Sequence, residues 1–409
     1  MFILSLSGLS AEEMDMEGCL RLALSNSPGI KKQRNTIIQY EYKIKQAISS
    51  FYPTIHLSGS YSHSFNSSSL KENSDNYSVS LGLNELLFNG LKRYNSYKVS
   101  LLDKLGVVQD YYSAWRNMVL NIKDKYYSIL LYQNQIKVLN MIKERRKEDL
   151  VIIKLKYQSG TENFASLTEM EADLKQSEYN ILEKQSFLRT AQISLNLLLA
   201  RPAGSALELR EEETSFPEFD FNKILVKANE LSPDINSARI RLQSGQYKLN
   251  SARSEFYPEL DLNGSYGLSD DKFFPENKSW SIGLSLSLPV FSGFSTVHKV
   301  NEIKTELKGL EETLKETENN LQSELQNLWT QYNLLKEKQK LTEIQYNAVL
   351  ENYKLLKLQY KQGQTTYLIL KQKENELSGY EIQKESLKYD MRMALAKLEK
   401  YIKELNLEE

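Results

Sequence analysis

The sequence has few residues that break helices or carry reaction chemistry. Its 409 residues include 8 Pro and 17 Gly, so long uninterrupted helices are expected. Cys19 is the only cysteine and there are three histidines. This excludes an intrachain disulfide and a cysteine-based metal cluster, and it leaves little material for acid–base or nucleophilic catalysis. Since no catalytic triad order, phosphate-binding glycine loop or zinc-binding helix motif is present, we expect no enzyme, no metal site and no cofactor.

An excess of charge of one sign is also missing. Lys and Arg number 52 and Asp and Glu number 53, so the net charge is -1. A nucleic-acid partner would require a basic excess, and we therefore expect none. No apolar run reaches the roughly 18 residues that a transmembrane helix needs.

The first residues are apolar but few. We interpret residues 1–11 as the remnant of a signal peptide, with a weak complete signal peptide or an ordinary chain terminus as the alternatives. Gly18-Cys19 could be read as a lipid-attachment motif. The acidic residues just before it, Asp15 and Glu17 among them, favour instead a small buried residue at the start of a helix.

The two halves of the chain are copies of one unit. Five short motifs recur in the same order at offsets of 203 or 205 residues, among them Phe51-Tyr52-Pro53, which returns as Phe256-Tyr257-Pro258. We expect a first structural repeat over residues 12–206 and a second over 207–409. A linker rich in Pro, Gly and Glu joins them at about residues 201–217.

Four segments alternate between apolar and small polar residues, which predicts strands at 53–66, 76–88, 258–269 and 279–290. A sheet packed on a soluble core is the commoner origin of such a pattern. Here the segments have the length that crosses a bilayer at a tilt, and their polar face is mostly Ser, Gly and Asn. Aromatic residues stand near the loop ends, as in a membrane barrel: Tyr61, Phe65, Tyr77 and Trp280.

Four strands cannot close a barrel by themselves. An open sheet edge in lipid leaves backbone groups unpaired at several kcal/mol each, so the edges must pair with other chains. A dimer would give eight strands and a filled interior, whereas a trimer would give twelve strands and a lumen. The small residues of the polar face favour the trimer.

Each pair of strands precedes a predicted helical hairpin, at 91–199 and at 294–404. From Leu101 to Ile129 the apolar residues step by alternating four and three, as in a coiled-coil seam. A helix of about 66 residues would be near 100 Å long. A further helix is expected before the first strand, over about residues 21–50. The mixed-sign run Lys143–Asp149 predicts a solvated helix face.

Taken together, these motifs resemble the TolC family of outer-membrane efflux proteins. The resemblance covers essentially the whole chain and is carried by residues 19–28, the two Phe-Tyr-Pro motifs, residues 288–293 and the two Tyr-x-x-Gly tips. It implies a mainly α fold with β strands, in which long antiparallel helices form a periplasmic α-barrel. Four strands per protomer would complete a trimeric 12-stranded β-barrel. It further implies a passive export duct of a tripartite efflux or type I secretion system.

The resemblance also implies partners: a periplasmic adaptor protein, an inner-membrane transporter and outer-membrane lipid. Three groups of site residues follow from it. The helix-hairpin tips, for adaptor docking and aperture control, are Tyr157, Gly160, Thr161, Tyr360, Gly363, Thr365 and Thr366. The strand starts are Phe51, Tyr52, Pro53, Phe256, Tyr257 and Pro258. The barrel-to-helix turns are Phe88, Gly90, Pro289, Phe291 and Gly293.

Two departures from the family pattern stand out. Some members carry an aspartate ring at the periplasmic aperture, but the matching positions here are Ile369 and Gln372. Pro289 has no counterpart in the first repeat. A non-conducting structural coiled-coil protein of the cell envelope is the alternative function, and it would behave as a water-soluble rod.

Overall fold

The computed structural model describes residues 13–65, 73–211 and 215–403, so the predicted signal-peptide remnant lies outside the described residues. The chain forms two compact units. The helical unit comprises residues up to 32, 112–232 and from 320 onward, and the sheet unit comprises 33–111 and 233–319. Each unit takes segments from both sequence repeats, so the units and the repeats divide the chain differently.

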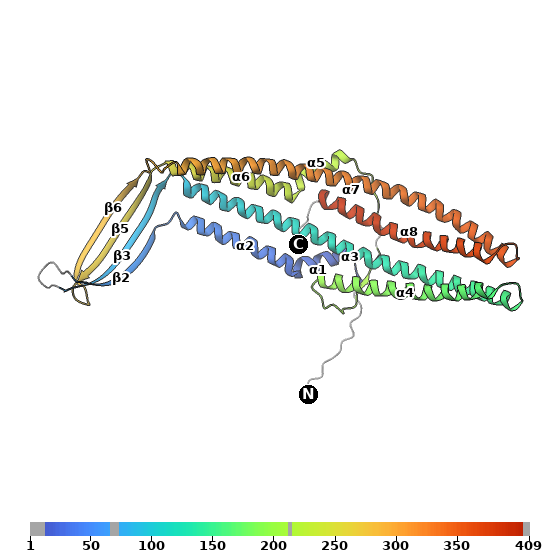
Figure 1. Ribbon diagram of the computed structural model, residues 1–409. Coiled ribbons are helices and arrows are strands. Elements are labelled where there is room, and N and C mark those ends of the chain that lie inside the picture. The colour runs from blue at the N-terminus through green and yellow to red at the C-terminus, as the bar shows by residue number, and fades with distance from the viewer. Residues whose placement is uncertain (1–12, 66–72, 212–214, 404–409) are drawn as a thin grey trace, which may run out of the picture. The chain divides into compact units, whose positions relative to one another are not determined.

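The same series of elements occurs twice along the chain (Figure 1). The first series is β1 (Glu13–Met14), α1 (Met16–Asn26), α2 (Pro28–Ser49), β2 (Thr54–Phe65), β3 (Asn73–Asn89), α3 (Lys92–Gln158) and α4 (Phe164–Leu198). The second series is β4 (Glu208–Leu209), α5 (Phe221–Leu231), α6 (Pro233–Arg253), the 3₁₀ turn η1 (Ser254–Phe256), β5 (Glu259–Asp270), β6 (Asn277–Ser287), α7 (Ser295–Lys361) and α8 (Tyr367–Ile402).

The helix predicted over residues 21–50 is broken in two. Ser27 separates α1 from α2, and Ser232 separates α5 from α6 at the matching place in the second repeat. Each serine is followed by a proline that begins the next helix. Proline favours the first helical position and disfavours the α conformation of the residue before it. The single-helix prediction was therefore wrong at Ser27.

The long helices agree with the prediction. α3 and α7 each have 67 residues, which corresponds to about 100 Å at 1.5 Å per residue. α4 and α8, the return helices, have 35 and 36 residues. Within the described part of the chain, none of the helices combines the length and the apolar character needed to cross a membrane.

The predicted seam of α3 is only partly correct. Trp115, Ile122, Tyr126 and Ile129 are buried, as the alternating steps require. Nearer the start of the helix the buried side chains are not the predicted seam residues but Leu102, Val107 and Tyr111. The predicted seam residue Leu105 is 49% exposed. The buried stripe of α3 therefore does not follow one strict heptad along the whole helix.

The core of the helical unit includes the linker between the repeats. The phenol of Tyr332 on α7 donates a hydrogen bond to the carbonyl oxygen of Pro217 at 2.8 Å, and the indole of Trp329 donates to Phe219 O at 3.1 Å. Tyr126 on α3 donates to Arg210 O at 2.5 Å, beside the short parallel pair β1–β4. Each of these aromatic side chains thus has its polar atom paired while its ring packs in the core.

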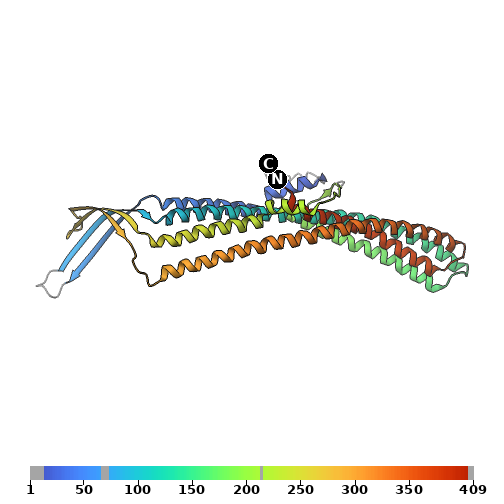
Figure 2. The ribbon, with the colours of Figure 1, turned by 90° about the horizontal axis from the view of Figure 1, so that it is seen from above.

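The sheet unit contains one antiparallel sheet in the order β2-β3-β5-β6 (Figures 1 and 2). Its two hairpins have the same register, because Tyr61 pairs with Tyr77 and the residues at the matching repeat positions, Tyr266 and Trp280, also pair. The four strands are confirmed. The last strand ends at Ser287, three residues before the predicted bound of 290.

Candidate functional site

Both helix tips turn on a glycine in the left-handed conformation. Gly160 and Gly363 each have φ of 76°, and their N–H groups donate to Tyr157 O and Tyr360 O. A side chain at such a φ is strained by about 1–2 kcal/mol. A Cβ atom at either glycine would meet nothing within 4 Å, so backbone conformation rather than space requires glycine here.

The two tips contact one another through Tyr360. Its phenol donates to Glu162 of the other tip at 3.0 Å, and its carbonyl accepts from the Lys156 ammonium at 2.7 Å. Burial and the neighbouring carboxylate raise the pKa of Tyr360, so it remains a proton donor. Its repeat counterpart Tyr157 is instead 41% exposed and packs beside Phe164. The sequence treats these tyrosines as equivalent, but the structure does not.

The predicted tip threonines also differ. The Thr161 hydroxyl donates to Lys156 O and contacts the Ser159 hydroxyl, both at 3.0 Å, which holds the first tip. Thr366 precedes α8 as its N-cap without a side-chain hydrogen bond, and Thr365 is half-buried in the turn. Ile369 and Gln372, the positions of the aspartate ring, are both exposed. Neither side chain carries a carboxylate.

A buried polar network links α3, α4 and α8 near the tips. Glu374 on α8 is 5% exposed and accepts from two arginines of α3. The Arg145 guanidinium lies 3.3 Å from Oε1, and the Arg146 guanidinium lies 3.2 Å from Oε2. Arg145 also donates to Glu381 on α8, and Arg146 donates to Ser177 on α4. Three helices, α3, α4 and α8, are thus joined by this network, and both oxygens of the Glu374 carboxylate are paired.

The solvated face predicted over Lys143–Asp149 was therefore wrong for three of its residues. Glu144 and Lys147 are exposed as predicted, but Arg145, Arg146 and Asp149 face the other helices. In a mixed-sign run the sequence does not indicate which charges find partners. Glu374 lies in a stretch of α8 whose other residues are mostly charged or polar. The sequence therefore did not indicate that its carboxylate is buried.

Asp149 on α3 extends this network toward α7. Its carboxylate accepts from the Tyr353 phenol at 3.3 Å and lies 3.0 Å from the Lys357 ammonium. Burial raises the pKa of Asp149, and the bond from Lys357 opposes that rise without cancelling it. A carboxyl in this position binds a proton more tightly than the same group in water.

The strand starts position the ends of α2 and α6. Phe51 and Tyr52 close α2 with hydrogen bonds back to Ile48 O and Ser49 O. Arg93, at the start of α3, donates to Ser50 O at 2.7 Å and stacks over the Phe51 ring. In the second repeat the η1 turn corresponds to the turn at Phe51 in the first. The backbone N–H of Tyr257 donates to Ser254 O. Pro53 and Pro258 each precede the first residue of a strand.

The barrel-to-helix turns have the same backbone in both repeats. Gly90 and Leu91 have φ of 63° and 68°, and Gly293 and Phe294 have φ of 61° and 64°. Two consecutive residues in the left-handed region are unusual, particularly when the second is large and apolar. Their recurrence at the same repeat position indicates that each strand must turn sharply into its long helix. Pro289 lies just past the end of β6.

The two faces of the sheet differ in character. On one face serine hydroxyls pair across strands at 2.8–2.9 Å, as in Ser58–Ser80 and Ser265–Ser281. The other face is apolar and exposed: Ile55, Leu57, Tyr61, Val79, Leu81, Tyr266, Trp280, Ile282, Leu284 and Leu286. Phe273 in the β5–β6 loop meets the Tyr77 ring edge to face, with 5.6 Å between the ring centroids. Phe273 was not among the aromatic residues that the sequence pattern singled out near the loop ends.

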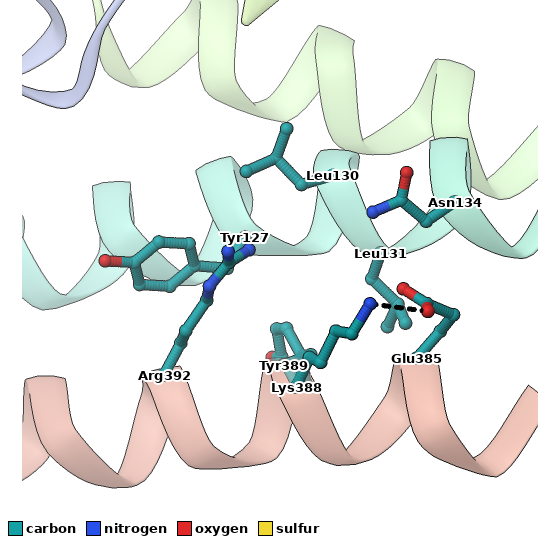
Figure 3. A pocket seen from close by; sticks show the side chains of 8 residues that line it. All are labelled: Tyr127, Leu130, Leu131, Asn134, Glu385, Lys388, Tyr389 and Arg392. Carbon is teal, nitrogen blue, oxygen red and sulfur yellow. Dashed lines mark hydrogen bonds and ion pairs between the residues drawn. The ribbon is translucent and has the colours of Figure 1, made fainter. Parts of the chain in front are cut away.

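A small hollow between α3 and α8 is lined by Tyr127, Leu130, Leu131, Asn134, Glu385, Lys388, Tyr389 and Arg392 (Figure 3). It has room for about one water molecule. Lys388 and Arg392 are turned to Glu385 and Glu211, so the hollow is unsuited to hold an organic substrate. Among residues 13–65, 73–211 and 215–403, no group of three His, Cys, Asp or Glu could hold a metal ion.

Comparison with known proteins gives a consistent result. A family model described as "Outer membrane efflux protein" matches residues 19–201 and 224–402. The alkaline protease secretion protein AprF of Pseudomonas aeruginosa is 22% identical over 54% of this chain and 48% of its own length. The outer membrane protein TolC of Escherichia coli is 24% identical over 76% of this chain and 66% of its own length.

Among solved structures, the outer membrane protein VceC of Vibrio cholerae is similar with a TM-score of 0.84, at 16% identity. The match covers 95% of each chain, so the similarity extends to the fold as a whole. The chain spans about half to two thirds of the length of the two curated relatives named above.

Proposed function

Since the chain belongs to the outer membrane efflux protein family, we propose that it is the outer-membrane channel of an export system. In this proposal three copies form one passive duct, which carries cargo across the periplasm and the outer membrane. The strands lie in the membrane and the helices extend into the periplasm.

The observation that carries the proposal is the two-faced sheet with open edges. Its exposed apolar face includes Leu57, Ile282 and Leu286, which are 74%, 70% and 72% exposed. Exposure of such a face to water costs roughly 25 cal/mol for each Å² of apolar surface. Lipid removes that cost but leaves the edge strands β2 and β6 with unpaired backbone groups.

Pairing with other copies satisfies both edges. Two copies would give eight strands, whose interior is filled by side chains, and three copies would give twelve strands around a lumen. The serine face supports the larger assembly, because small hydroxyl side chains line a water-filled interior without filling it. The helix tips would then lie at the periplasmic end of the duct.

We further propose that the tips dock with a periplasmic adaptor protein joined to an inner-membrane transporter. Tyr157 and Phe164 expose 41% and 64% of their surface beside the first tip, and Leu368 exposes 67% beside the second. Exposed aromatic and aliphatic groups next to a rigid turn are typical of a contact surface. Energy for transport would come from the partners, because the sequence contains no phosphate-binding loop.

The test is the mass and solubility of the protein produced with a functional signal peptide. We expect it in the membrane fraction, released by mild detergent as a particle of three chains of 47.4 kDa each. Light scattering coupled to size exclusion separates the protein mass from the detergent. A water-soluble monomer or dimer would overturn the proposal and favour a non-conducting coiled-coil protein instead.

A further inference from the structure

The polar face of the sheet carries few groups that can be charged. Alternate residues of a strand share one face, and this face is marked by the hydroxyl pair Ser58–Ser80. Among the described strand residues that share it, only His56, Glu259 and Asp261 can carry a charge near neutral pH. The other charged or histidine residues of the strands stand on the apolar face: His63, Asp75, Glu85, Asp270 and Lys278.

His56 and Asp261 occupy the same position in the two repeats. Pairs in the hairpin β2–β3 map onto pairs in β5–β6 when 205 is added to the first residue and 203 to the second. The pair His56–Gly82 thus corresponds to Asp261–Ser285, and the sheet contains both pairs. One repeat therefore presents an imidazole where the other presents a carboxylate.

The imidazole of His56 lies across the neighbouring strand β3. A Cβ atom at Gly82 would collide with the Cε1 and Nε2 atoms of this ring, so no larger residue fits beneath it in this arrangement. In the second repeat the matching place is held by Ser285, opposite the smaller side chain of Asp261. The two opposed residues thus differ together between the repeats, and His56 is held on the polar face.

Few charges lie close to the two groups. The neighbours of His56 on the polar face of β2, β3 and β5 are uncharged: Thr54, Ser58, Ser80, Gly82, Asn84 and Ser265. Asp261 is opposed by Leu86 and Ser285. The residues of β6 on this face are all serine, glycine or asparagine. Glu259 is the remaining charge on the face, and beyond the strand start Glu255 is already paired with two lysines.

We propose that His56 and Asp261 form one ring inside the duct and determine its selectivity between cations and anions. This inference rests on the proposed trimeric duct, in which the polar face lines the lumen. The repeats share one register and follow one another around the barrel axis, so equivalent positions lie at one height. Three copies then place three imidazoles and three carboxylates alternately around the lumen. Rings of charged side chains select ions in pores.

The charge of this ring depends on pH. Imidazole groups exchange a proton between about pH 5 and 8, whereas aspartates remain ionised over that interval. At the upper end the ring carries only the charge of Asp261 and favours cations. At the lower end the protonated imidazoles of His56 oppose the carboxylates, and the preference for cations falls. Glu259 contributes a negative charge near the ring throughout, so the preference decreases without reversing.

The reversal potential of trimers in a planar lipid bilayer measures this selectivity. A KCl gradient with a dilute side of about 0.01 M leaves the ring weakly screened, because the Debye length is then about 30 Å. For the unaltered protein we expect the cation-to-anion permeability ratio to fall at least about twofold from pH 8 to pH 5. In His56→Gln most of this fall should disappear. Asp261→Asn should lower the ratio at pH 8, whereas Asp261→Glu, which keeps the charge, should retain it.

The other two histidines of the chain supply matched controls. His63 stands on the apolar face of the sheet, and His298 lies on α7, outside the sheet. His63→Gln and His298→Gln should both keep the pH dependence of the unaltered trimer. A pH response that persists in His56→Gln, or that vanishes in either control, would overturn the role of His56. An unchanged permeability ratio in Asp261→Asn would overturn the ring.

Failure of the duct itself is distinguishable from failure of the ring. Light scattering first establishes that each variant is a trimer. If unaltered trimers in the bilayer carry no current, the proposed function fails and the ring fails with it. If they carry discrete current steps whose selectivity responds to neither His56→Gln nor Asp261→Asn, the duct stands and only the ring is overturned.

Discussion

Arg146 and Glu374 join the two helical hairpins across 228 residues of sequence. The Nε and Nη2 atoms of Arg146 each lie 3.2 Å from Glu374 Oε2, while Arg145 pairs with the opposite oxygen of the same carboxylate. Because Glu374 is almost fully buried, its charge is tolerated only as long as both arginines face it. This relationship makes the carboxylate a structural centre of the helical unit.

Glu374→Gln should therefore strongly destabilise the helical unit. The change leaves two arginines without their shared carboxylate, and removal of one partner of a buried ion pair costs about 3–5 kcal/mol. The measurement is thermal unfolding of the detergent-extracted protein, followed by circular dichroism. Glu351→Gln is the matched control, because its pair with Lys354 is exposed on both sides and exposed pairs contribute at most about 1 kcal/mol. Equal midpoints for the two variants would refute the structural role of Glu374.

The pH dependence of stability should carry a contribution from Asp149. Burial raises the pKa of Asp149 above its ordinary value of 3.8, so between the two values the folded state binds more protons than the unfolded state. The contribution of Asp149 to the free energy of unfolding is then fully present below pH 3.8 and is lost as pH rises through the raised pKa.

In Asp149→Asn this loss should disappear, since the amide does not titrate. We expect the unfolding free energy of the variant to fall less, relative to the unaltered protein, as pH rises from about 4 to 7. Denaturant titrations at four pH values measure it. Asp103→Asn, at an exposed site on the same helix, is the control. If the unfolding free energies of Asp149→Asn and of the unaltered protein change in parallel with pH, the contribution assigned to Asp149 is contradicted.

The linker between the repeats should be held by the phenol of Tyr332. In Tyr332→Phe the carbonyl of Pro217 loses its donor while the ring stays in the core. We expect a loss of about 1–2 kcal/mol in the free energy of unfolding, as for other buried hydrogen bonds. Tyr179→Phe, on a side chain that is 60% exposed, should change stability by less than about 0.5 kcal/mol. A loss of equal size in both variants would indicate that the bond to Pro217 has no specific role.

The tip glycine should matter more for export than for assembly. Because Gly363 has φ of 76° and open space around it, Gly363→Leu should cost only about 1–2 kcal/mol and still form trimers. We predict that it nonetheless blocks export, since the added side chain projects from the proposed docking tip. Gly379→Leu, on an exposed face of α8 that also has nothing within 4 Å, should export normally. Normal export by the Gly363→Leu trimer would exclude Gly363 from the docking surface.

Much of this fold could be predicted from the sequence because its signals are periodic. The alternation of apolar and polar residues predicted the four strands, and the heptad steps predicted helices of the observed length. The motif Ser-Pro at residues 27–28 marks the break between α1 and α2, which the sequence prediction did not include. The charged groups were harder to place. Arg145 and Glu144 are neighbours in one mixed-sign run, yet Arg145 is turned to a partner 229 residues away and Glu144 is exposed. Only the packing of distant helices decides that difference.

The tips show a similar limit. Tyr157 and Tyr360 occupy the same position of the repeat and have the same local motif, so sequence reasoning assigned them one role. The structure places Tyr360 against Glu162 of the other tip and leaves Tyr157 exposed beside Phe164 of its own tip. A sequence repeat predicts local conformation, such as the φ shared by Gly160 and Gly363, but it does not predict which copy is covered.

In the proposed duct, three copies of this chain enclose a water-filled path across a membrane. The ionic current through purified trimers inserted in a planar lipid bilayer tests this path, with insertion counted by a fluorescent label on the protein. We expect discrete current steps that scale with the number of inserted trimers. Labelled trimers in the bilayer that carry no current at any applied voltage would contradict the proposal.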